Sequence, residues 1–433
     1  MKIRGTFKFI AFIAMMTSIM VLIVTTSTGV AQPKPTVKPI IIGMVVPLKF
    51  LYGEGAVRAA TLAIEEINAA GGVNVAGVRY PFKLEAADGR ENEPGTPVTE
   101  TLIVVEKLIL DKGAKFFVGG PFRSEAALAA MDLFSKHKAI AIFGGGTLTP
   151  ELSKRIANNQ DKYKYIFRQS GDVRWLVKEF TELFAGLETS YGFKKAYIAV
   201  QDVAHARAAG DVMESTLKGR GWAVLGKDKF PTGSSDFSPS LLKAKEGGAQ
   251  VLFAWFDAMD VLVMVKQWYD LKIPVLPLGF PNYVEPFETW KQTDGKCEYW
   301  ICTDVFAGVC YANFNPWVER WWNAYKKRWG REPEMMSTPV PYTIVYVLKD
   351  AIERAGSLET DKVVKALEET DLRGTPQGRI RFDRQDHQTI NSFNPEEGAV
   401  GSIFQWQGGK RVLIFPPKIA VGKIQLPPWM KIK

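Results

Sequence analysis

The stretch AKFFVGGPFRSEAALAAMDLFSKHKAIAIF, residues 114–143, decides the fold class. Its two apolar ends, residues 114–118 and 139–143, predict short buried strands. Between them, residues 124–136 predict a helix that starts at a serine. A strand followed by a helix and a second strand is typical of a parallel sheet with helices on its faces. The stretch therefore indicates an α/β protein.

The same alternation extends over most of the chain, in two successive series. In the first series, further strands are expected at residues 39–46 and 80–87, and further helices at residues 53–70 and 97–110. In the second series, helices are expected at 176–187, 205–219, 238–245 and 261–268, and strands at 196–200, 222–229, 251–255 and 275–278. Two more helices, 315–330 and 338–355, follow. The chain therefore predicts two α/β lobes and a cleft between them, where ligands bind beyond the carboxyl ends of the strands.

The first 31 residues have the pattern of a secretory signal peptide. Lys2, Arg4 and Lys8 precede an apolar run over residues 9–24, and small residues follow up to Ala31. The run is short for a membrane span, which needs about twenty residues, so a membrane anchor is the alternative interpretation. The sequence does not show whether the signal is cleaved. We expect the folded part to be periplasmic or extracellular.

The composition of the 433-residue chain argues against several classes of function. The formal charge of +9 is scattered without a block of Lys and Arg, so no nucleic-acid partner is expected. Three His and three Cys leave little material for a multi-ligand metal site, so we expect no metal and no cofactor. The sequence contains no P-loop, GxSxG or HExxH motif. These observations predict a protein that is not an enzyme.

Three cysteines, Cys297, Cys302 and Cys310, lie within fourteen residues. An export compartment would allow a disulfide between two of them. Buried free thiols are the second possibility, and a metal site is the third, although no CxxC motif is present. The sequence alone does not choose among these states.

Three loops that follow predicted strands contain glycines, and two of them also carry a Ser or Thr near the start of a helix. They cover residues 47–55, 119–125 and 144–152. Glycine lets the backbone approach a ligand closely, and a helix start offers free N–H groups beside a hydroxyl. Each loop alone fits an ordinary turn and helix cap. Three such loops at the same edge of a sheet favour a site that captures a carboxylate.

These motifs resemble those of the periplasmic leucine/isoleucine/valine-binding proteins, the solute-binding components of ABC importers. The similarity runs from about residue 40 to residue 415 and is clearest at residues 52–53, 67–72, 119–124 and 147–152. It implies two Rossmann-like lobes with parallel sheets joined by a three-segment hinge, the type I periplasmic binding protein fold. By this resemblance, lobe 1 covers 40–170 and 305–386, lobe 2 covers 171–304 and 387–415, and 416–433 form a C-terminal tail. The resemblance also implies a monomer that delivers its ligand to a membrane permease.

The resemblance assigns ligand-binding roles to several residues of the first lobe. Ser124 matches the serine that binds the ligand carboxylate, and Thr147 matches the threonine of the next loop, or Thr149 if the gap lies elsewhere. Backbone groups of Gly145 and Gly146 would complete this carboxylate clamp. Tyr52 matches the aromatic wall at the first loop, and Arg123 would add a cation beside Ser124.

In the second lobe the resemblance is incomplete. Phe256 matches an aromatic residue but lacks its hydroxyl, and Pro281 stands where the family has a glutamate that binds the ligand ammonium group. Asp257 or Asp202 could replace that glutamate, because a buried ammonium needs an anionic partner. The family's tyrosine after the strand at 196–200 is also lost, and His205 lies in that loop. An apolar pocket is expected from Tyr52, Phe122, Trp175, Trp255, Phe256 and Phe280.

We therefore expect an extracytoplasmic solute-binding component of a branched-chain-amino-acid-type ABC importer. Its ligand would be an amino acid, or an aromatic or aliphatic carboxylate that lacks the α-amine. Two alternatives have a different role. A ligand-sensing receptor component could use the same fold, and a secreted enzyme is opposed by the scarcity of His and the missing nucleophile motif.

Overall fold

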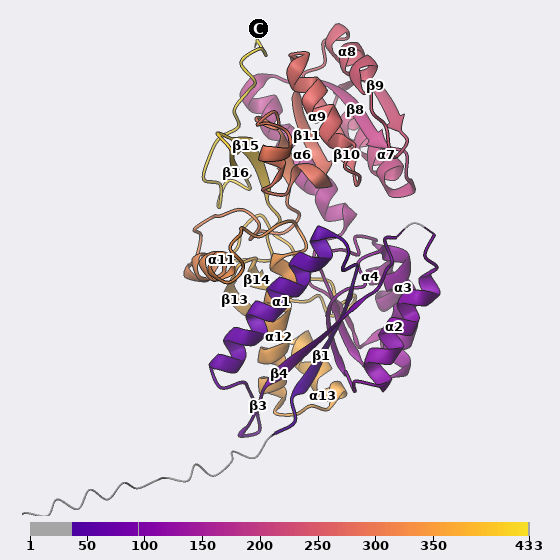
Figure 1. Cartoon of the computed structure of the whole chain (residues 1–433), viewed down its shortest axis with the longest axis vertical. Coiled ribbons are helices and arrows are strands. Elements are labelled where there is room, and N and C mark those ends of the chain that lie inside the picture. Colours follow the sequence, from indigo (N-terminus) through magenta and orange to yellow (C-terminus); the bar gives the residue numbers. More distant parts are fainter. Residues whose placement is uncertain (1–36, 94, 432–433) are drawn as a thin grey trace, which may run out of the picture. The chain divides into compact units, whose positions relative to one another are not determined.

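Two separate β-sheets, each accompanied by helices, organise the chain (Figure 1). The computed structural model describes residues 37–93 and 95–431. The predicted signal segment, residues 1–31, lies outside the described residues, as does the anchor alternative. From residue 38 onward, the described chain forms one compact unit that contains both sheets.

The first sheet is fully parallel and has the strand order β4-β1-β5-β6-β7. Its strands are β1 (Ile40–Val46), β4 (Phe82–Asp88), β5 (Phe116–Gly119), β6 (Ile140–Phe143) and β7 (Ile166–Arg168). Every residue of β5 and β6 is buried, so these strands are continuous apolar runs, as is typical of a parallel sheet covered on both faces. The helices α1 (Leu51–Ala69), α2 (Val98–Leu110) and α3 (Ser124–Lys136) connect them.

Side chains on the two faces of the first sheet pack against different helices. Met44 and Val118 belong to the core that includes α1 and α12 (Pro339–Ala355). Val45 and Phe117, one position away along the same strands, pack with buried residues of α2 and α3. Because successive side chains of a strand point to opposite faces, each strand serves both cores. The sheet therefore has helices on both faces (Figure 1).

The second sheet has seven strands in the order β16-β15-β12-β11-β10-β8-β9. Its parallel part consists of β8 (Lys195–Gln201), β9 (Ala223–Phe230), β10 (Val251–Phe256), β11 (Leu276–Pro281) and β12 (Ile301–Thr303). The strands β15 (Ile403–Gln407) and β16 (Lys410–Phe415) extend one edge in antiparallel fashion. The predicted α/β class with mostly parallel sheets is confirmed. The antiparallel edge was not predicted.

The remaining elements connect or flank the sheets. Helices of the second sheet are α6 (Val173–Tyr191), α7 (Ala204–Gly219), α8 (Ser238–Glu246) and α9 (Val261–Asp270). Shorter or peripheral elements are β2 (Val73–Val75), β3 (Val78–Tyr80), α4 (Glu151–Asn158), α5 (Gln160–Tyr163), η1 (Asn282–Val284), α10 (Thr289–Gln292), α11 (Pro316–Trp329), α13 (Thr360–Glu368), β13 (Leu372–Thr375) and β14 (Gly378–Ile380).

The chain passes between the two sheets three times. It leaves the first sheet after β7 and enters α6, then leaves the second sheet after β12 and returns to α12, which packs on α1. It reaches the second sheet again between β14 and β15. The third passage runs beside the first, because Arg168 of β7 forms a parallel bridge with Gln388. Three passages are the number that the hinge of the predicted fold requires.

The C-terminal segment after β16 packs along the second sheet as far as residue 431, the last described. Gln425 forms two backbone hydrogen bonds with the side chain of Gln405, each 2.7 Å long. The Trp429 ring lies 5.4 Å from that of Trp268, and its indole N–H donates to the Ile273 carbonyl at 2.9 Å. The sequence left open whether this tail packs on a lobe, and the structure shows that it does.

The three cysteines are all free and buried. Burial raises the pKa of the Cys297 thiol to about 12, so it stays protonated at neutral pH. Of the three states left open by the sequence, the structure therefore has the buried free thiols. Among the described residues, no helix is long and apolar enough to cross a membrane.

Candidate functional site

Loops at the carboxyl ends of the first sheet are joined to one another by hydrogen bonds. The buried Glu91 carboxylate, after β4, accepts the backbone N–H of Phe122 at 3.0 Å. Arg123 donates to the Glu91 carbonyl oxygen at 3.1 Å. The backbone N–H of Thr147, after β6, donates to the Phe122 carbonyl oxygen at 2.7 Å. Three of the loops that follow strands in this sheet thus form one connected edge.

Two buried backbone donors at this edge have no partner among the described residues. Gly145 and Gly146 are both buried, and neither N–H group donates a hydrogen bond to any residue that the structure describes. Gly145 has φ +88°, a conformation that favours glycine. A Cβ atom on Gly146 would lie 2.7 Å from the Phe122 Cβ atom. Buried N–H groups are nearly always paired, so this pair of donors is suited to an anionic ligand.

Ser124, Arg123 and Thr147 surround these donors but differ in availability. Ser124 is the first residue of α3, and its hydroxyl makes no hydrogen bond within the described chain. Arg123 is 44% exposed and forms an ion pair with Glu125 at 3.1 Å. The Thr147 hydroxyl already donates to the Pro121 carbonyl oxygen at 2.7 Å. Ser124 and Arg123 can therefore reach a ligand, whereas Thr147 mainly holds the loop in place.

Tyr52 adds an aromatic wall to the same edge, in the first turn of α1. Its ring lies 5.4 Å from that of Phe50 and 6.3 Å from that of Phe122. Its hydroxyl accepts a hydrogen bond from Asn92, and its carbonyl oxygen accepts one from Ser337 at 2.8 Å. Burial raises the pKa of Tyr52, and the nearby Tyr283 and Asp257 raise it further. Tyr52 is therefore a neutral phenol at physiological pH.

The carboxyl ends of the second sheet hold a polar group of three side chains. Asp257, directly after β10, forms an ion pair with His205 at the start of α7. Asn282, directly after β11, donates from its amide to the Asp257 carboxylate at 3.0 Å. The Asp257 backbone N–H donates to the Gln201 side chain at 2.8 Å. The sequence prediction identified Asp257 and His205 separately, and the structure brings them together.

This polar group is accessible and charged. The His205 side chain is 57% exposed and that of Asp257 is 32% exposed. Burial lowers the pKa of the imidazole, but the hydrogen bond and charge of Asp257, together with the charge of Glu125, outweigh this and raise it overall. The imidazole is therefore held preferentially in its protonated form.

Three other predicted residues of the second lobe are buried or already paired. Phe256 is fully buried, with its ring 6.0 Å from that of Phe230 and 5.9 Å from that of Phe237. Pro281 is buried at the end of β11 and carries no charge. Asp202 forms its own ion pair with Arg207 at 2.7 Å. The predicted aromatic wall at Phe256 is therefore core in this structure, as are Trp255 and Phe280.

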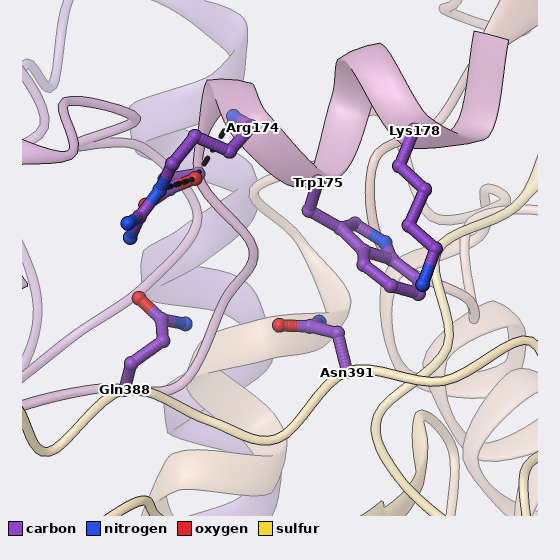
Figure 2. Close-up of a pocket in the computed structure, with 6 residues that line it drawn as sticks. Arg174, Trp175, Lys178, Gln388 and Asn391 are labelled. Carbon is purple, nitrogen blue, oxygen red and sulfur yellow. Dashed lines mark hydrogen bonds and ion pairs between the residues drawn. The ribbon is translucent and has the colours of Figure 1, made fainter. Parts of the chain in front are cut away.

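Trp175 lies at a separate pocket beside the hinge (Figure 2). Its ring lies 4.8 Å from that of Phe393, and its indole N–H donates to the buried Glu179 at 2.6 Å. The pocket is lined by Asp172, Arg174, Trp175, Lys178, Gln388 and Asn391. Figure 2 shows the side chains of α6 facing those of the segment after β14, the first and third passages between the sheets. These contacts tie Trp175 to the hinge.

Sequence reasoning missed Asn92, Asn282 and Ser337. Asn92 and Asn282 follow strands of the two sheets, so their position at the carboxyl edges was a usable signal. Ser337 precedes α12 and reaches two loops only through the fold. Its hydroxyl donates to the Tyr52 carbonyl oxygen at 2.8 Å, and a Cβ atom on Gly145 would lie 3.0 Å from its Cα atom. Among the described residues, no group of three or more His, Cys, Asp or Glu side chains could hold a metal ion.

Sequence comparison places these features in a family. A sequence model described as "Periplasmic binding protein" matches residues 39–395. The chain belongs to the periplasmic binding protein family. The match covers both sheets except for the antiparallel strands β15 and β16.

Relatives and solved structures agree with this membership. The chain is 23% identical over 395 residues to "Leu/Ile/Val-binding protein homolog 8" of Brucella abortus. The aligned region covers 87% of this chain and 89% of the relative. The substrate-binding protein LivJ from Streptococcus pneumoniae, solved with isoleucine, has a TM-score of 0.70 at 19% identity and covers 87% of this chain and 100% of its own. A solute-binding protein from R. palustris, solved with benzoate, has a TM-score of 0.67 at 12% identity. The match covers 90% of this chain and 99% of that protein. At these identities, the solved structures establish the fold, and this family consists of solute-binding proteins.

Proposed function

We propose that this chain is the solute-binding component of an ABC importer of the branched-chain-amino-acid type, and that it captures a small carboxylate between its lobes. Family membership supports the general role. The division into lobe 1 (40–170 and 305–386) and lobe 2 (171–304 and 387–415) is part of the proposal. The strands of the two sheets fall within these ranges, and the three passages between the sheets would serve as the hinge.

The observation that carries the proposal is the pair of unpartnered N–H groups at Gly145 and Gly146. A carboxylate offers two acceptor oxygens, so it can satisfy both donors at once. Ser124 adds a free hydroxyl at the start of α3, where the helix dipole also favours an anion. Arg123 supplies a partly exposed cation next to it. Four groups of the first lobe thus suit the negative end of the ligand.

The aromatic side chains beside these donors suit an apolar ligand body. Tyr52 and the buried Phe122 lie next to the glycine loop, with ring centres 6.3 Å apart. The ligands named for two structural neighbours, isoleucine and benzoate, each combine a carboxylate with an apolar body. We include both amino acids and amine-free carboxylates as candidate ligands. We further propose that the protein acts as a secreted monomer, without enzyme activity, and delivers its ligand to a membrane permease.

Calorimetric titration of the protein from residue 32 onward tests the proposal. Leucine, isoleucine and phenylalanine are compared with 4-methylpentanoate, 3-phenylpropanoate and benzoate. A bound ligand at 100 times its dissociation constant should also stabilise the fold by about 2.7 kcal/mol in a thermal-shift measurement. Ser124→Ala should weaken binding of every carboxylate that the wild type binds. If none of these carboxylates binds, the proposed ligand class is wrong.

A further inference from the structure

The polar group of Asp257, His205 and Asn282 lies outside the proposed carboxylate clamp, and its net charge affects which ligands fit. It lies at the carboxyl ends of β8, β10 and β11, the edge at which parallel sheets bind ligands. A ligand whose carboxylate is held at Gly145 and Gly146 would present its other groups to this edge. The charge that the ligand meets there decides which ligand classes fit.

We propose that His205 determines ligand specificity: by pairing with Asp257, it cancels the negative charge of the second lobe and favours a carboxylate without an ammonium group. This inference rests on the proposed function and deepens it by naming the substrate class. Without the imidazole, Asp257 would be a partly exposed carboxylate with only the neutral Asn282 amide as its side-chain partner. Such a carboxylate would attract the ammonium group of an amino acid.

The other titratable and charged groups near His205 and Asp257 do not take over the role of His205 in compensating the charge of Asp257. Glu125 approaches His205 from α3, and its negative charge adds to that of Asp257 in holding the proton on the imidazole. Tyr52 and Tyr283 approach Asp257, and burial raises the pKa of both phenols, so they are neutral at physiological pH. Asp202 and Arg207, near the start of α7, neutralise each other. The charge on His205 therefore decides whether Asp257 is compensated.

The same arrangement gives the specificity a pH dependence with a defined sign. The protonated imidazole compensates Asp257 at low pH. As pH rises through the raised pKa of His205, the imidazole loses the positive charge that compensates Asp257. The α-amine of an amino acid remains protonated over this range. Affinity for amino acids should therefore increase with pH relative to affinity for the matching amine-free acids.

The test measures dissociation constants for two matched pairs, leucine with 4-methylpentanoate and phenylalanine with 3-phenylpropanoate. Wild type should bind the amine-free member of the pair it accepts at least tenfold more tightly at pH 6. His205→Gln should shift this ratio at least tenfold towards the amino acid, and His205→Gln combined with Asp257→Asn should reverse that shift. Wild type should show the same trend between pH 5.5 and pH 8.5, and His205→Gln should not. Lys218→Ala, which breaks the Lys218–Glu214 pair towards the C-terminal end of α7, should leave the ratio unchanged.

The possible failures are distinguishable. If wild type binds the amino acids more tightly at pH 6, or if His205→Gln changes the ratio by less than twofold, the inference is wrong while the proposed function stands. If wild type binds neither member of either pair, the proposed ligand class fails and the inference fails with it. His205 is more than half exposed, so its substitution should preserve the fold, which a melting temperature close to that of wild type verifies.

Discussion

Arg168 and Asp172 form an ion pair of 3.0 Å, with side chains only 0% and 4% exposed. Arg168 ends the last strand of the first sheet, and Asp172 caps α6 of the second lobe. Arg168 also donates to the Thr147 carbonyl oxygen at 3.0 Å and to the side chain of Gln388 on the third passage. One guanidinium thus holds together the glycine loop and two segments of the hinge.

Replacing Arg168 by Met should strongly destabilise the protein. Burial lowers the pKa of Arg168 to about 10 despite the charge of Asp172, so the side chain remains charged at neutral pH. Met would leave the buried Asp172 carboxylate and two backbone carbonyl groups without this partner. Breaking a buried pair in this way costs roughly 3–5 kcal/mol. Urea unfolding at pH 7 measures the loss.

The matched control is Arg207→Ala, which breaks the Asp202–Arg207 pair. Both side chains of that pair are 40% or more exposed. An exposed pair contributes about 0–1 kcal/mol, so this variant should unfold close to wild type. A loss below about 1 kcal/mol for Arg168→Met would contradict the proposed role of the buried pair.

Gly146→Ala should impair ligand binding, because the loop has no room for a Cβ atom. The added atom would lie 2.9 Å from the Phe122 Cα atom, so the backbone would have to move. Gly186→Ala is the control, since a Cβ atom there meets nothing within 4 Å in the middle of α6. It should be neutral or stabilise by up to about 1 kcal/mol. Titration with the best-binding carboxylate should show at least a tenfold loss for Gly146→Ala alone.

The sequence predicts the order of helices and strands well where the apolar residues recur at a regular spacing or form a short continuous run. The helix predicted at residues 124–136 has the bounds of α3, and the short apolar runs correspond to β5 and β6. The antiparallel strands β15 and β16 were not predicted. They lie far along the chain from β12, the strand that β15 joins, and only the tertiary fold brings these segments together.

The candidate site is predictable at the level of loops and less so at the level of side chains. The sequence placed the loops with Gly145 and Asp257 after predicted strands, and in the structure they follow β6 and β10. All six residues of β10 are buried, so the sequence has no polar alternation to show which way Phe256 points. The pairing of His205 with Asp257 depends on the order of β8 and β10 in the sheet, and the local sequence does not contain that information.

The stability of the protein should fall as pH rises towards 8, because of Asp304. This side chain is completely buried just after β12, with one oxygen accepting a hydrogen bond from Ser402 and the other unpaired among the described residues. Burial raises the pKa of Asp304 from 3.8 to about 7, so between these values the folded state holds a proton that the unfolded state has lost. Stability from this proton is present below pH 4 and is lost as pH rises through 7.

Asp304→Asn should remove this contribution, because the amide does not titrate. The difference in unfolding free energy between the variant and wild type should therefore grow in favour of the variant from pH 4 to pH 7 and level off above pH 7. The pKa shift corresponds to on the order of 4 kcal/mol. Urea unfolding of both proteins at each pH unit measures it. Burial also raises the pKa values of Glu179 and Glu285, and the charge of Asp304 adds to this, so the measured difference includes the coupling of Asp304 to both groups. Parallel pH profiles for the two proteins would show that Asp304 is ionised in the folded state.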